Sequence, residues 1–96
     1  MAQNITLTIP ANTWTMITDS SVTAVRVQNK SIFTVELSAT ASTVAPSNSN
    51  GSLDLAGGET LAADMTLAQL FPGVAGASRL WVYSKDFSAV LSVSHA

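Results

Sequence analysis

Alternation of apolar and polar residues over short stretches is the feature that most constrains what this chain can fold into. Between residues 22 and 39 the sequence reads VTAVRVQNKSIFTVELSA, with a polar QNKS break in its middle. The apolar residues on either side of the break each share one face: Val25 and Val27 before it, and Phe33, Val35 and Leu37 after it. A period of two residues indicates strands with one buried and one solvated face. We therefore predict two strands folded back on each other as a hairpin.

Further strands are predicted along the 96 residues, separated by turn-forming residues. They fall at residues 4–9, 13–18, 53–55, 60–62, 79–85 and 87–94. The inward-facing positions predicted near the N-terminus are Ile5, Leu7, Ile9, Trp14 and Met16. Residues 79–85 are apolar on both faces, which indicates a strand buried between layers or against a partner.

One helical turn competes with strands between residues 64 and 71. Thr66 is placed to cap a turn over residues 67–70, which Pro72 and Gly73 would end. Residues 40–52 are small and polar, and they predict a long loop that is either flexible or reaches a neighbour. With seven to eight short strands and at most one helical turn, residues 1–96 predict one all-β domain. We expect an antiparallel β-sandwich or barrel of jelly-roll or immunoglobulin-like type.

Composition excludes several classes of protein. No apolar run approaches the roughly 20 residues that span a bilayer, so we expect no membrane insertion. Four Lys and Arg against six Asp and Glu give a net charge of −2, which disfavours nucleic acid as a partner. Cysteine is absent, and the segment MAQNITLTIP does not resemble a signal peptide, so we expect synthesis in a cytoplasm.

No set of residues predicts catalysis, a cofactor or a metal ion. His95 is the single histidine and is expected to be a solvent-exposed tail residue. Three carboxylates at five-residue spacing lack a calcium-loop pattern and predict solvated turns: Asp54, Glu59 and Asp64. No serine has the setting of a nucleophile, so an enzyme is not expected.

The aromatic residues leave two functions open. Trp14, Trp81 and Tyr83 suit either a sugar-stacking platform or use in the core or an interface. A sugar platform requires an indole face that is open to solvent, whereas a core tryptophan is covered. The small number of aromatics in the chain favours core or interface use.

Four segments resemble small virion proteins of tailed bacteriophages: NITLTIPANTWTMI, VTAVRVQNKSIFTVELSAT, the GGETL turn and the closing RLWVYSKDFSAVLSVSHA. The resemblance implies a β-sandwich made in the bacterial cytoplasm that decorates or cements the capsid, or begins a head fibre. It implies binding to the major capsid protein on the outer head surface, and homo-oligomers, with a trimer favoured. The alternatives are a carbohydrate-binding or host-adhesion module and a head–tail or tail component.

Five residues are the interface candidates of this hypothesis. The N-terminal segment could add a strand to a neighbour's sheet, and the aromatic pair lies in the stretch that is apolar on both faces. The candidates are Ala2, Gln3, Asn4, Trp81 and Tyr83.

Overall fold

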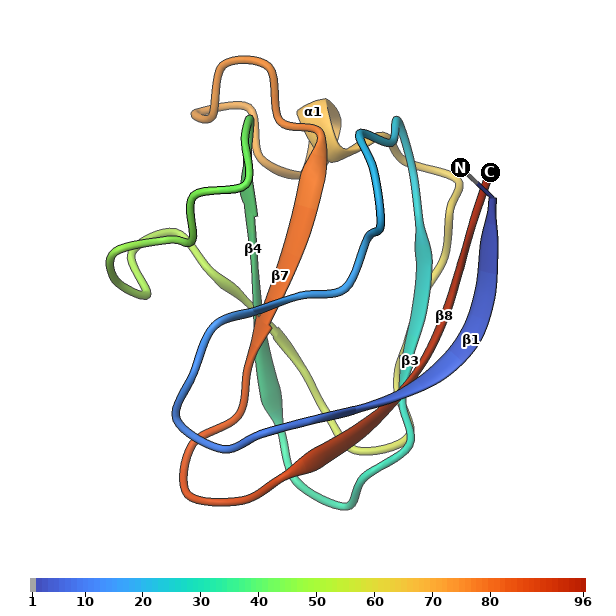
Figure 1. The fold of residues 1–96 in the computed structure, drawn as a ribbon, viewed down its shortest axis with the longest axis vertical. Coiled ribbons are helices and arrows are strands. Elements are labelled where there is room, and N and C mark those ends of the chain that lie inside the picture. Colours follow the sequence, from blue (N-terminus) through green and yellow to red (C-terminus); the bar gives the residue numbers. More distant parts are fainter. Residues whose placement is uncertain (1) are drawn as a thin grey trace.

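Eight strands and one short helix make up the computed structural model, which describes residues 2–96 (Figure 1). In chain order they are β1 (Gln3–Ile9), β2 (Thr15–Met16), β3 (Arg26–Asn29), β4 (Val35–Thr40), β5 (Leu53–Leu55), β6 (Thr60–Leu61), α1 (Leu67–Leu70), β7 (Arg79–Tyr83) and β8 (Ala89–His95). The predicted all-β class, with seven to eight strands and a single helical turn, is confirmed.

The strands form two antiparallel sheets of four, with orders β1-β8-β3-β6 and β2-β7-β4-β5. Figure 1 shows β4 and β7 in one layer and β1, β3 and β8 in the other. Strands from the start of the chain pair with strands from its end: β1 with β8, β2 with β7, β3 with β6 and β4 with β5. This order is that of a jelly roll, a long hairpin of strands rolled into two facing sheets.

The core lies between the two sheets and is built from the alternating inner positions. In β8 every second residue from Ala89 to His95 is buried, and the residues between them are half-buried. The most deeply covered apolar strand residues are Ile9, Val27, Val35, Leu37, Leu80, Val82, Ala89, Leu91 and Val93. Covering a valine, leucine or isoleucine side chain in this way stabilises the fold by about 1.5 to 3 kcal/mol.

The predicted hairpin within residues 22–39 is wrong. β3 pairs with β8 and β6 in one sheet, whereas β4 pairs with β5 and β7 in the other. Residues 30–34 therefore carry the chain across from one sheet to the other. Phe33, predicted to share a buried face with Val35, lies in this crossover and is 51% exposed. Alternation on each side of a connection is the same for a hairpin and for a crossover, so the pattern could not separate them.

Inward positions near the N-terminus were predicted correctly in part. Ile9 is buried, Leu7 is half-buried and Ile5 is 41% exposed. Ile5 and Leu7 line an open groove of about 270 Å³ with β2 and the residues after it, so the facing sheet leaves the first half of β1 uncovered. Met16 lies opposite Trp81, whose neighbours Leu80 and Val82 face the core. Met16 is therefore on the outer face of its sheet, not the inner one.

The helical turn forms where it was predicted. Thr66 Oγ1 accepts a hydrogen bond from Gln69 N at 3.1 Å, and Gln69 Oε1 accepts one from Thr66 N at 2.8 Å. This reciprocal capping box fixes the start of α1. Leu67 on α1 is fully buried and fastens the turn to the core. Nothing helical within residues 2–96 is long and apolar enough to cross a membrane.

The two sheets are joined at the crossover by the side chain of Asn29. Its Nδ2 donates to Phe33 O at 2.6 Å and to Leu55 O at 3.0 Å, and its Oδ1 accepts from Ser31 N at 2.9 Å. Asn29 is 0% exposed. One amide at the end of β3 thus satisfies three backbone groups of the crossover and of β5, in the opposite sheet.

We expect Asn29→Ala to lower the free energy of unfolding by about 3 kcal/mol, because the substitution leaves these backbone groups without their partner. Urea denaturation followed by circular dichroism measures the change. Asn48→Ala is the matched control: Asn48 is exposed and its Oδ1 accepts a single bond from Asn50 N. Equal losses for the two variants would contradict the role given to Asn29.

Candidate interaction surface

The residues that the structure describes gather no cluster of metal-binding side chains. Within residues 2–96 there is no group of three or more His, Cys, Asp or Glu side chains that could hold a metal ion. Asp54, Glu59 and Asp64 are exposed, as predicted for turn carboxylates, and Glu59 Oε1 accepts a bond from Ala56 N.

His95 is not the exposed tail residue that we predicted. It ends β8 on the inner face, opposite Gln3, and is 7% exposed. Its Nε2 lies 3.4 Å from Asp19 Oδ1, a contact without hydrogen-bond geometry. The alternation of β8 continues through His95, and this was the signal in the sequence that could have placed it inside.

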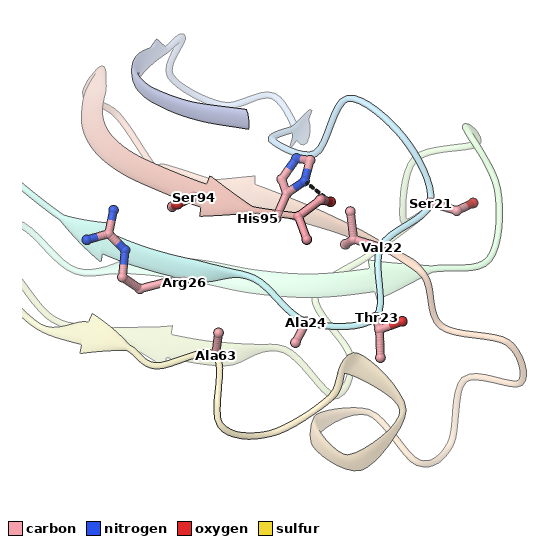
Figure 2. A pocket seen from close by; sticks show the side chains of 9 residues that line it. Ser21, Val22, Thr23, Ala24, Arg26, Ala63, Ser94 and His95 are labelled. Carbon is pink, nitrogen blue, oxygen red and sulfur yellow. Dashed lines mark hydrogen bonds between the residues drawn. The ribbon is translucent and has the colours of Figure 1, made fainter. Parts of the chain in front are cut away.

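Next to His95 the surface is hollowed by a depression of about 640 Å³ (Figure 2). It lies between the end of β8, the segment before β3 and the residue Ala63 that follows β6. The other lining residues are small except Arg26, whose guanidinium donates to Ser92 Oγ at 3.2 Å. Figure 2 shows the His95 imidazole bonded to Ala96 O rather than reaching Arg26. Among the described residues that line the hollow, Arg26 and His95 thus have separate partners.

The predicted interface residues lie on two different sheets. Ala2 and Asn4 are exposed at the start of the edge strand β1, and Gln3 Nε2 donates to Ile17 O at 2.9 Å. Trp81 and Tyr83 belong to β7 in the other sheet. The five residues therefore do not form one continuous surface.

Trp81 is covered rather than open. It is 6% exposed, and its indole N–H donates to Thr40 Oγ1 at 2.7 Å. Tyr83 is half-buried, and its ring centroid lies 5.3 Å from that of Trp14, which is also half-buried. Of the three aromatics considered for a sugar platform, Trp14 and Tyr83 are together and Trp81 is a packing residue.

Two large apolar side chains that are adjacent in the chain are exposed at the crossover. Ile32 is 86% exposed and Phe33 is 51% exposed. The Phe33 ring rests on Phe87, with centroids 4.4 Å apart and planes tilted by 46°. We call Ile32, Phe33 and Phe87 the apolar tip. Phe87, from the loop between β7 and β8, is half-buried and joins the tip to the core.

The apolar tip is held by the strands around it. Asn29 holds the backbone of the crossover from one side, and Ser31 Oγ accepts a bond from Val90 N of β8 at 2.8 Å. A Cβ atom added to Gly57 would lie 2.7 Å from Ser31 O and 2.8 Å from Ile32 C, so the loop before β6 presses directly on the crossover. The backbone of the tip is thus fixed while its side chains face solvent.

Neither the tip nor its anchor was identified from the sequence. Asn29 was interpreted as an ordinary turn residue because it lies in the polar QNKS segment, and Ile32 and Phe33 were assigned to a strand. A buried asparagine and an exposed one look identical in a single sequence, because only the tertiary partners differ.

No known family model, curated protein or solved structure matches this chain.

Gly57→Ala should lower stability by about 1 to 3 kcal/mol, since the new methyl group meets backbone atoms that must shift. The control is Gly73→Ala, where nothing lies within 4 Å of the added Cβ; we expect a change of less than about 1 kcal/mol there. Thermal unfolding compares the two. A neutral Gly57→Ala would mean that the two loops are not in contact.

The two tryptophans should respond differently to acrylamide. Emission from Trp14, isolated in the variant Trp81→Phe, should be quenched more steeply than emission from Trp81, isolated in Trp14→Phe. Trp81→Phe should also cost about 1 kcal/mol of stability, because Thr40 loses its donor. Equal quenching would mean that Trp81 is accessible, and would return it to the candidates for a sugar platform.

Proposed function

We propose that this chain is a non-enzymatic bacteriophage structural protein that decorates the outer surface of the capsid by binding the major coat protein. The observation that carries the proposal is the apolar tip, in which exposed Ile32 and Phe33 stand on an anchored backbone. The bacteriophage part of the proposal rests on the resemblance of the sequence segments described above.

A fixed apolar tip suits a protein partner. Exposed apolar side chains that adjoin one another are typical of binding sites. Because the backbone of the tip is already ordered, its docking loses little conformational entropy. Burying Ile32 and Phe33 in a pocket of the partner would supply about 1.5 to 3 kcal/mol for each side chain. Each copy is held by its own contacts, so surface around the tip must add to these two side chains to offset the cost of association.

Charge and fold are compatible with this role. Only 10% of the residues are charged, so docking desolvates few ions. Jelly rolls serve as capsid domains and also as lectins, and a fold alone does not select between these functions. The preference for coat binding therefore rests on the apolar tip and not on the fold.

Carbohydrate binding is the second candidate, and Trp14 with Tyr83 is the observation that favours it. The two rings contact each other on the outer face of the β2-β7-β4-β5 sheet and are partly open to solvent. Trp81, which would have widened a stacking platform, is covered. A platform of one tilted pair is small, so we rank this candidate below coat binding.

Co-sedimentation tests the proposal. Capsids assembled from the coat protein encoded in the same genome are mixed with the purified chain and pelleted. We expect the wild type to pellet in a fixed ratio to the coat protein, and Ile32→Ser and Phe33→Ser to weaken binding at least about tenfold each.

The matched control is Val44→Ser. Val44 is 72% exposed in the loop after β4, at the opposite end of that strand from the tip, so its removal should leave binding unchanged. A wild type that stays in the supernatant would overturn the proposed function. Tip variants that pellet as well as the wild type would instead overturn the assignment of the tip as the binding surface.

A further inference from the structure

The jelly roll has four edge strands, and they differ greatly in length. β6 and β2 have two residues each and β5 has three, whereas β1 has seven. Very short edge strands are one way in which proteins prevent their sheets from pairing with other chains. Three edges are protected in this way and β1 is not.

The free edge of β1 presents alternate backbone groups to solvent. Just after β3, Lys30 N donates to Val90 O of β8. Since antiparallel pairs alternate, the backbone N–H and C=O groups of the even-numbered residues of β8 face β3, and those of its odd-numbered residues face β1. In β1 the odd-numbered residues, which lie opposite them, are therefore bonded to β8. The N–H and C=O groups of Asn4, Thr6 and Thr8 point outward, and within residues 2–96 none of them has a hydrogen-bond partner in a loop or side chain.

Other protective devices are also missing from β1. The segment QNITLTI contains no charged residue and no proline. Its register with β8 runs without a bulge from Gln3 opposite His95 to Ile9 opposite Ala89. Such an edge is long, regular and uncharged, and it is ready to accept another strand.

We propose that β1 pairs antiparallel with β1 of a second copy of this chain, about a twofold axis at Thr6. Since the outward groups are those of residues 4, 6 and 8, Thr6 would bond to the second copy's Thr6, and Asn4 to the second copy's Thr8. The two β1-β8-β3-β6 sheets would then continue into one sheet of eight strands. This inference does not depend on coat binding.

Side chains in this register complement each other. Ile5, 41% exposed, would lie opposite the second copy's Leu7, and both would cover the groove that Ile5 and Leu7 line in the single chain. On the other face Thr6 would meet the second copy's Thr6, a pairing that stabilises antiparallel sheets. Apolar residues meet apolar ones and polar residues meet polar ones, which is the requirement for a strand to recognise a copy of itself.

The absence of charge favours a second copy over an unrelated strand. Self-pairing places residues of one segment beside residues of the same segment, so charges of one sign in that segment would repel each other, and β1 carries no charge. A threefold arrangement would need β1 to pair with a different edge, and the other edges offer two or three residues only. The edge geometry therefore points to a dimer rather than to the trimer that the sequence resemblance implies.

Sedimentation equilibrium of the full chain, without capsids, tests the proposal from about 10 µM to about 1 mM, where a contact below standard interface size associates. We expect the mass to rise to twice 9.9 kDa. Ile5→Lys replaces the apolar contact with the second copy's Leu7 by a charge and places the two cations diagonally across the axis, about 7 to 8 Å apart. It should weaken the dimer at least about tenfold. Val44→Lys, the same change at an exposed site elsewhere, should leave the mass unchanged.

Cross-linking tests the register. The chain has no cysteine, and hydrogen-bonded partners across antiparallel strands have Cα atoms about 5.5 Å apart, within the range for a disulfide. Thr6→Cys should therefore form a covalent dimer under mild oxidation. Thr8→Cys should not, because its two copies would lie roughly 14 Å apart along the strands. A monomer or a trimer at all concentrations, or a dimer that survives Ile5→Lys and does not cross-link through Thr6→Cys, would overturn the proposal.

Discussion

The amide of Asn29 is the contact on which both the fold and the apolar tip depend. A jelly roll must carry its chain from one sheet to the other repeatedly, and each crossing exposes backbone groups that no ladder satisfies. At the crossing from β3 to β4, Asn29 bonds the backbone of Ser31, Phe33 and Leu55. Because the Asn29 side chain itself is fully buried, loss of these bonds costs more than loss of bonds at the surface. The same bonds that join the sheets also hold Ile32 and Phe33 in place.

Alternation in the sequence identified most strands but not their partners. β8 follows the period of two throughout and β4 follows it from Val35 to Leu37, and α1 begins at the predicted cap, because these features depend on residues close in the chain. The hairpin at residues 22–39 failed because the connection between β3 and β4 is decided by β5, β6 and β8, which are distant in sequence. His95 was misplaced for a similar reason: the pairing of β8 with Gln3 extends the strand to the end of the chain.

Candidate interface residues were harder to predict than the strands. Trp81 was selected because it lies in a stretch that is apolar on both faces, yet its outer position in β7 is covered within the chain and its N–H is bonded to Thr40. Ile32 was not selected because it precedes the alternating residues that begin at Phe33 and carried no prediction of burial or exposure of its own; its exposure follows from its position in the crossover. The N-terminal residues Ala2 to Asn4 were selected for strand addition, and they do lie on the long free edge, where Asn4 has an outward-facing backbone.

The tip and the free edge occupy different parts of the molecule, and their geometry limits how they can act together. The tip lies beside the end of β1 that contains Ile9. Ile9 pairs with Ala89 of β8, and Phe87 of the tip lies two residues before Ala89. An antiparallel pairing of two β1 strands reverses one molecule relative to the other, so the two tips would point in opposite directions. Such a dimer gains no avidity on a single flat surface, because its second tip cannot reach that surface. If both contacts form at once, the dimer must instead link two separate coat surfaces, or one tip must remain free.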